Sequence, residues 1–84
     1  MGEEKTRLTV SIYGQNYTIV GKESSEYIRT LAGYVEEKMH RIAQDNDRLD
    51  TGRLAILTAL NIADDYFRLR QKVEELEKQI EKDK

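Results

Sequence analysis

The chain has 84 residues, with 14 Lys or Arg against 16 Asp or Glu, so its net charge is -2, and it contains no cysteine and one histidine. Disulfides and a Cys/His zinc site are therefore excluded, and a domain this small is expected to gain stability by oligomerisation. No apolar run reaches the roughly 18 residues of a membrane span, so we expect a cytoplasmic protein. The slight acidic excess disfavours nucleic-acid binding.

A β-hairpin is predicted first, because apolar and polar side chains alternate, are interrupted at Gly14, and alternate again. We predict a two-residue turn made by Gly14 and Gln15, with Gly14 supplying the positive φ. This turn would pair Ile12 with Tyr17 and unite the apolar residues on one face. The other apolar residues of that face are Leu8, Val10 and Ile19.

An amphipathic helix is predicted next, with Ser24 as its N-cap and Glu26 in its first turn, where the helix dipole favours an acid. Its apolar residues recur at spacings of three and four and form one stripe. These residues are Ile28, Leu31, Ala32, Val35, Met39 and Ile42. The polar residues 44–50 are predicted to be the connecting loop.

A second, long helix is predicted from Thr51 to the end of the chain, capped by Asp50 and with Leu49 and Leu54 as a hydrophobic staple. Its first half has apolar residues on several faces, as a buried helix would, whereas its second half narrows to a heptad seam typical of a coiled coil. Asn61 is a candidate for a hydrogen bond across an interface. The expected oligomer interface is Ala59, Asn61, Ile62, Tyr66, Leu69, Val73, Leu76 and Ile80.

Charges beside the seam favour a parallel pair of helices, because opposite charges would face each other across the interface. The attractive pairs are Asp65 with Arg70 and Lys72 with Glu77. Aromatic residues at helical spacing are expected to serve the core and the interface rather than a ligand cage. They are Tyr27, Tyr34, Tyr66 and Phe67.

Metal and catalytic sites are disfavoured. Glu37 and His40 have the Glu-x-x-His spacing of di-iron bundles, but no second set of inward-facing carboxylates accompanies them, so His40 is interpreted as a surface histidine. Asp64 and Asp65 point about 100° apart on a helix and are interpreted as a solvated acidic face. We expect no enzyme activity, no metal and no cofactor.

The polar face of the hairpin raises the alternative of a DNA-binding ribbon dimer, since Arg7, Thr9 and Ser11 lie on it. Phosphate neutralisation needs several cations on one side, and only Arg7 is cationic there. A small helical dimeric adaptor for another protein is the more competitive alternative, because it shares every fold-level feature.

Four stretches, Val10–Tyr17, Tyr27–Ala32, Arg53–Ala55 and Ala59–Asp65, resemble the family of the cell division protein ZapA. The resemblance runs from about Arg7 to the end of the chain. It implies a factor that binds FtsZ, the bacterial tubulin relative, and crosslinks or bundles its filaments at the mid-cell division ring. It also implies a dimerising head and a long helix that pairs as a coiled coil and can join two dimers into a tetramer.

The expected fold class is α+β, with an N-terminal β-hairpin, one amphipathic helix and a long C-terminal helix that enters a coiled coil, as a dimer or dimer of dimers. Residues 1–6 are expected to be a flexible leader, 7–64 the head and 65–84 the coiled-coil tail. Longer family members extend well past this tail, and they carry an arginine where Gln15 stands, so a charge contact at that position is not carried over.

The FtsZ-binding surface is expected at the tip of the hairpin, which carries little of the core, and at two arginines near the start of the long helix. The candidate residues are Tyr13, Gly14, Gln15, Asn16, Tyr17, Arg48 and Arg53.

Overall fold

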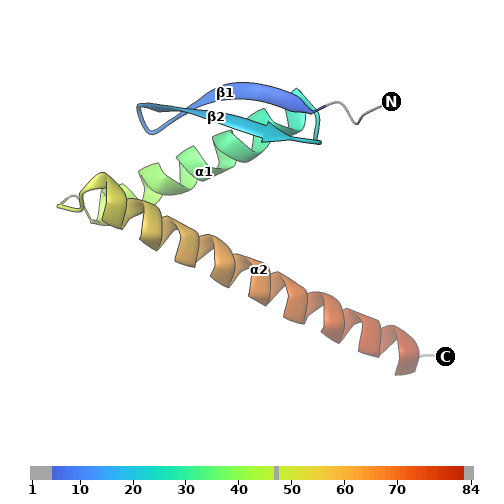
Figure 1. Cartoon of the computed structure of the whole chain (residues 1–84). Helices are drawn as coiled ribbons and strands as arrows, with labels where there is room; N and C mark the ends of the chain where they lie inside the picture. The colour runs from blue at the N-terminus through green and yellow to red at the C-terminus, as the bar shows by residue number, and fades with distance from the viewer. Residues whose placement is uncertain (1–4, 47, 83–84) are drawn as a thin grey trace.

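The computed structural model describes residues 5–46 and 48–82, and within them it has two antiparallel strands followed by two helices (Figure 1). The strands are β1 (Thr6–Ile12) and β2 (Gln15–Gly21), and the helices are α1 (Ser25–Asp45) and α2 (Thr51–Lys82). The predicted α+β class, with its hairpin, amphipathic helix and long second helix, is confirmed. Thr6 already belongs to β1, and residues 1–4 of the predicted leader lie outside the described residues.

The predicted register of the hairpin is wrong by two residues. The turn consists of Tyr13 and Gly14, so Ile12 pairs with Gln15 rather than with Tyr17. Both turn residues have positive φ, 52° for Tyr13 and 81° for Gly14, as the type I′ turn requires. A turn of this type matches the twist of the flanking strands and favours glycine at its second position, where Gly14 stands.

The apolar face of the hairpin survives the register error, because a shift of two residues leaves every side chain on its original side. Leu8 pairs with Ile19 and Val10 with Tyr17. On the opposite, exposed face the hydroxyl oxygens of Thr9 and Thr18 lie 3.1 Å apart. The hairpin therefore has one apolar and one polar side, as the alternation predicted.

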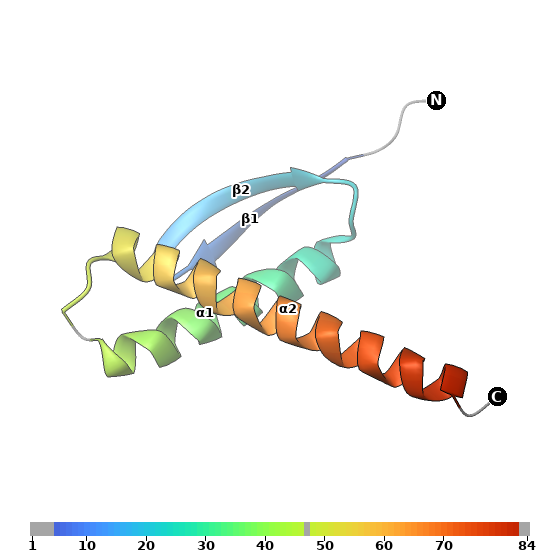
Figure 2. The ribbon, with the colours of Figure 1, turned by 90° about the horizontal axis from the view of Figure 1, so that it is seen from below.

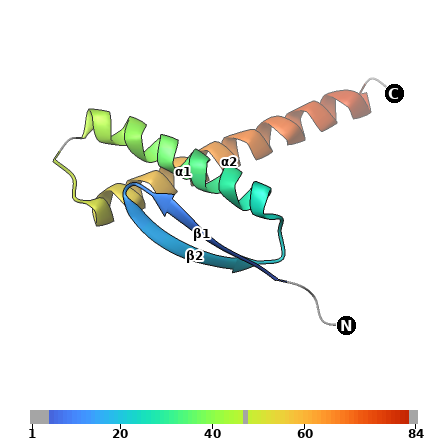
Figure 3. The ribbon, with the colours of Figure 1, turned by 90° about the horizontal axis from the view of Figure 1, so that it is seen from above.

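The core lies between the apolar face of the hairpin and α1. Its buried members are Val10, Ile28 and Ala32, with Leu8, Ile12 and Ile19 packed around them. Ser24 caps α1 as predicted, since its Oγ accepts a hydrogen bond from the backbone N of Tyr27 at 3.1 Å. Figure 3 shows the hairpin lying over α1, with α2 behind it.

The two helices are joined by a short loop and diverge from it. Asp50 caps α2 as predicted, because its Oδ1 accepts a hydrogen bond from the backbone N of Arg53 at 2.8 Å. Leu54 is only 2% exposed, and Thr58, also buried, donates its hydroxyl to the Leu54 carbonyl at 2.8 Å. Apolar packing between the helices is thus concentrated near the loop, and Figure 1 shows the two helices diverging beyond it. Figure 2 shows the C-terminal end of α2 extending beyond α1.

The chain alone is extended. Its radius of gyration is 17.3 Å, whereas a compact chain of this length would have about 12 Å. Residues 66–82 of α2 are all exposed. Among residues 5–46 and 48–82, neither helix combines the length with the apolar composition that crossing a membrane requires.

Candidate functional site

The predicted coiled-coil seam lies along the free part of α2 as one exposed apolar stripe. Its members Tyr66, Leu69, Val73, Leu76 and Ile80 are each between 46% and 63% exposed. Ala59 is exposed as well, and Ile62 is half-buried near the other helix. The structure therefore brings the predicted interface residues onto one helix, and their pairing with a second chain stays a prediction.

Two further apolar stripes are exposed that the sequence interpretation assigned to burial. On α1, Tyr27, Leu31 and Tyr34 follow each other at spacings of four and three and are about half exposed. On α2, the stripe consists of Ile56, Leu60 and Phe67. Leu31 was expected in the apolar stripe of the amphipathic helix, and the first half of α2 was expected to be buried on several sides. The helical spacing of these residues is the signal that marks them as separate stripes.

A polar cluster joins the middle of α1 to the middle of α2. The Nζ atom of Lys38 donates to Asn61 Oδ1 at 2.9 Å and to Asp65 Oδ2 at 2.5 Å. It also lies 5.7 Å from the centroid of the Tyr34 ring. The hydrogen bond from Lys38 holds the pKa of the Asp65 carboxyl below its usual value, and the same bond raises the pKa of Lys38.

This cluster gives several predicted interface groups a partner inside the chain. Asn61, a candidate for a bond across the interface, is bonded to Lys38. Asp65 also contacts Lys38, while Arg70 lies 3.8 Å from Glu74 on its own helix. The expected interchain pairing of Asp65 with Arg70 would have to compete with these contacts.

The groups considered for metal or acid chemistry are engaged in ordinary helix-surface pairs. His40 Nε2 lies 3.4 Å from Glu36 Oε2, and Glu37 faces Arg41 at 3.9 Å. Asp64 accepts a hydrogen bond from Arg68 at 2.9 Å. Across the part of the chain that the structure describes, no three His, Cys, Asp or Glu side chains gather in a way that could hold a metal ion.

The predicted partner-binding residues lie at one end of the molecule, where the hairpin turn and the α1–α2 loop are both found (Figure 1). Tyr13 is half-buried, whereas the tip residues Gly14–Tyr17 are exposed. Arg48 is exposed in the loop, and Arg53 projects from the first turn of α2 with its Nε 3.8 Å from Asp50 Oδ2. The structure thus gathers at one end two segments that are far apart in the sequence.

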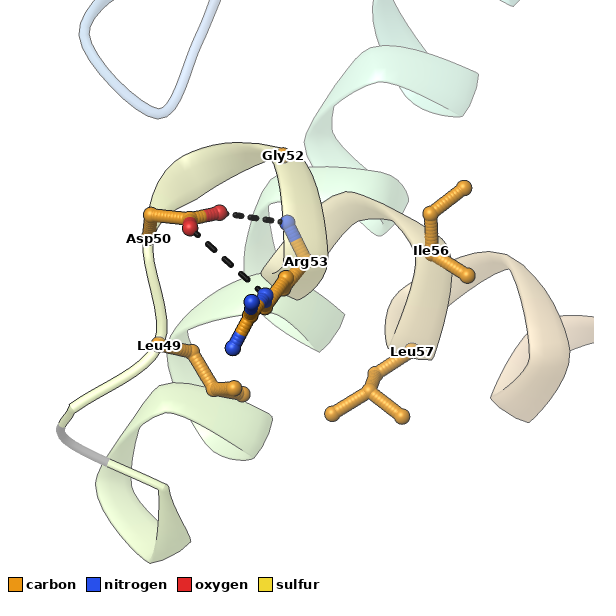
Figure 4. A pocket seen from close by; sticks show the side chains of 6 residues that line it. All are labelled: Leu49, Asp50, Gly52, Arg53, Ile56 and Leu57. Atoms are coloured by element: carbon orange, nitrogen blue, oxygen red, sulfur yellow. Dashed lines mark hydrogen bonds and ion pairs between the residues drawn. The ribbon is translucent and has the colours of Figure 1, made fainter.

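An apolar hollow of about 550 Å³ opens beside Arg53 at the start of α2 (Figure 4). Besides Arg53 and its partner Asp50, it is lined by Leu49, Gly52, Ile56 and Leu57. Apart from Arg53, the sequence interpretation did not assign these residues to a binding surface. The sequence signal for this hollow was the apolar pair Ile56 and Leu57 close to Leu49 of the loop. In the sequence, Leu49 was interpreted only as half of the hydrophobic staple with Leu54.

The fold and these surfaces define a small hairpin-and-helix α+β protein whose long second helix carries an unpartnered coiled-coil-type seam. The family model of "Cell division protein ZapA" matches residues 8–84. The cell division protein ZapA of Bacillus subtilis (strain 168) is 51% identical over 81 residues, covering 95% of each chain. That of Geobacillus kaustophilus (strain HTA426) is 48% identical over 83 residues, or 99% of this chain and 91% of the relative.

A solved structure, described as a ZapA mutant dimer from Geobacillus stearothermophilus, matches the fold with a TM-score of 0.72 and 44% identity. The match covers 95% of this chain and 93% of that chain. The chain therefore belongs to the ZapA family of cell division proteins, as the motif resemblance predicted, and its role lies in cell division.

Proposed function

We propose that this protein is a non-enzymatic division factor that self-associates, binds FtsZ and crosslinks or bundles FtsZ filaments in the cytoplasm at the mid-cell ring. The single observation that carries the proposal is the exposed apolar seam on α2 in a chain of the ZapA family. A factor of this kind needs no cofactor and no reacting group, because it acts by holding filaments together.

Self-association is supported by the amount of apolar side chain that one copy leaves in water. Contiguous apolar stripes of this length on a small soluble chain mark interaction surfaces. The heptad spacing from Tyr66 to Ile80 suits a second copy of the same helix. The solved ZapA mutant of Geobacillus stearothermophilus is described as a dimer. We assign the same state to this chain, with the stripes on α1 and the first half of α2 as further covered faces.

Crosslinking then follows from symmetry. Each copy places the hairpin turn and the α1–α2 loop at the end of the molecule away from the free part of α2 (Figure 1). A symmetric oligomer repeats that end, and a filament repeats the partner site, so weak single contacts become stable crosslinks through effective concentration. Arg53, exposed beside the apolar hollow, and Arg48, exposed in the preceding loop, suit an acidic partner surface.

The function is tested by sedimenting polymerised FtsZ with and without the protein at low speed, where only bundles pellet. We expect the protein to raise the pelleted fraction of FtsZ and to appear in the pellet itself. Binding without bundling would leave FtsZ in the supernatant and would contradict crosslinking. No binding at all would instead favour an adaptor for another protein partner.

The tip is tested by changing Gln15→Glu together with Asn16→Asp. Both side chains are exposed, and a carboxylate at position 15 keeps the acceptor that Tyr17 Oη donates to at 2.9 Å, so the fold is expected to survive. The two new charges should repel an acidic partner and lower FtsZ pelleting several-fold, with light scattering showing an unchanged oligomer mass.

A control for the tip variant is Gln71→Glu with Lys78→Glu, which makes the net charge more negative by three, one more than the tip variant does, on the exposed side of α2 opposite the seam. This control should pellet FtsZ as well as the unchanged protein does. If the tip variant behaves like the control, the binding surface is assigned to Arg48, Arg53 and the apolar hollow instead.

A further inference from the structure

The hairpin turn contains a residue in an unfavourable backbone conformation. Tyr13 has a φ of 52°, in the left-handed region that bulky L-residues rarely adopt, whereas Gly14 at 81° tolerates such a φ freely. Turns of this type favour asparagine or glycine at both positions. A tyrosine keeps this conformation only where its surroundings hold it there.

The surroundings of Tyr13 are supplied by α1. The ring of Tyr13 packs against the imidazole of His40, with centroids 4.9 Å apart and ring planes at 44°. One helical turn earlier, Glu36 places its Oε2 atom 3.4 Å from His40 Nε2 and so restrains the imidazole. Tyr13 is half-buried, while the residues that follow it, Gly14–Tyr17, are exposed.

The ring contact between Tyr13 and His40 lies beside a hollow. A hollow of about 270 Å³ lies between the turn and the helix, lined by Tyr13, Gly14, Glu36 and His40. The turn therefore has room to move relative to α1 if the two rings separate. An exposed hairpin tip without such an anchor would sample several positions and would lose entropy when a partner fixes it.

We propose that His40, oriented by Glu36, is a positioning residue that holds Tyr13 in its left-handed conformation and so preorders the exposed tip of the hairpin for its partner. His40 acts through Tyr13, and it is assigned no chemistry of its own. The part of this inference that concerns the partner rests on the proposed function, whereas the part that concerns the turn stands on the ring contact and the backbone geometry.

The turn is tested without any partner, by amide hydrogen exchange at Gln15, which pairs with Ile12 across the turn. His40→Ala should speed exchange at Gln15 about two- to tenfold, the range expected for loss of one aromatic contact. His40→Phe keeps a ring in place and should restore slow exchange. Equal exchange in the alanine variant and the unchanged protein, or a failure of phenylalanine to rescue, would overturn the inference.

Repeating His40→Ala in a protein that also carries Tyr13→Asn distinguishes a positioning role of His40 from a general loss of stability. Tyr13→Asn creates an Asn-Gly sequence, which favours this turn by itself. In that background His40→Ala should no longer alter exchange at Gln15, because the turn no longer depends on the ring contact. An effect of undiminished size there would show that His40 acts elsewhere in the head and would refute the positioning role.

The link to binding is read from a titration of FtsZ pelleting. His40→Ala should raise the concentration needed for half-maximal pelleting by a similar factor and leave the plateau unchanged, with His40→Phe close to the unchanged protein. An unmoved half-maximal concentration would show that tip order does not serve binding. If the unchanged protein fails to pellet FtsZ, the proposed function fails and this link fails with it, and the exchange data alone decide whether His40 holds the turn.

Discussion

Lys38 joins the two helices by polar contacts with Asn61 and Asp65. Lys38 and Asp65 stabilise the fold over different ranges of pH. The Asp65 carboxyl has a pKa below its unfolded value because the Lys38 ammonium donates to it. Such a group stabilises the fold above its unfolded pKa, and the contribution is lost as the pH falls through its folded pKa. The raised pKa of Lys38 acts oppositely, since its contribution is lost only as the pH rises through a value above 10.5.

Both contributions are therefore present between about pH 5 and pH 9, and the carboxyl's contribution disappears in acid. We expect Asp65→Asn to lower the urea midpoint at pH 7, and to have a steadily smaller effect as the pH is lowered through the folded pKa of the carboxyl, because the unchanged protein then loses the same charge. The comparison variant is Asp64→Asn, whose carboxylate pairs with Arg68 on the exposed side of the same helix. A difference at pH 7 that does not shrink as the pH is lowered through the acid range would mean that the ion pair is not its cause.

At the scale of elements, the junction of α1 and α2 depends on one leucine. Leu54 is the largest fully buried side chain of the described residues and is 2% exposed. We expect Leu54→Ala to reduce the free energy of unfolding by about 2–5 kcal/mol, because it removes buried methyl groups and leaves a cavity. Leu54→Met conserves volume and should cost less than about 1.5 kcal/mol.

Urea unfolding at one fixed chain concentration measures both variants, since oligomerisation makes stability depend on concentration. Similar losses from alanine and methionine would mean that the site tolerates no change of shape, and that cavity formation is not the cause.

The elements themselves could be predicted from the sequence because their signals are local. Ser24 and Asp50 were recognised as caps, and each accepts a backbone hydrogen bond from the residue three positions on. The hairpin register could not be fixed in the same way, because both registers keep the apolar face intact. The turn at Tyr13 packs against His40, a contact distant in sequence that no local rule contains.

The candidate surfaces were predictable only in part, for a related reason. Periodicity shows that a side chain prefers to leave water, but it does not show which chain covers it. Leu31 and Leu60 were therefore expected to be covered without the covering chain being identified, and within one chain they are exposed. The apolar hollow at the start of α2 was missed because Leu49 and Leu57 reach it from different elements.

The shape of the whole molecule is set by α2, whose residues 66–82 extend beyond its contacts with α1 and are all exposed. Val73→Glu with Leu76→Glu places two charges in the seam, and we expect light scattering to show a lower oligomer mass, because buried unpaired charges are costly. The head should keep its helicity, since Ile28, Ala32 and Leu54 are buried within one chain.

The control for the seam is again Gln71→Glu with Lys78→Glu, which changes the outer side of the same turns and should leave the mass unchanged. An unchanged mass in the seam variant would show that α2 is not an interface. Loss of all helicity in that variant would show that head and tail fold as one cooperative unit.

The order of contacts along the chain has a kinetic consequence. Within residues 5–46 and 48–82, the extensive contacts join β1 to β2, β1 to α1, and α1 to α2, which are near one another in sequence. Low contact order of this kind gives fast folding, so the head can form within one chain before any encounter. Under the proposed function, the apolar stripe of α2 is covered only when two chains meet, so the time needed to form the crosslinker would depend on the concentration of chains rather than on the folding of each.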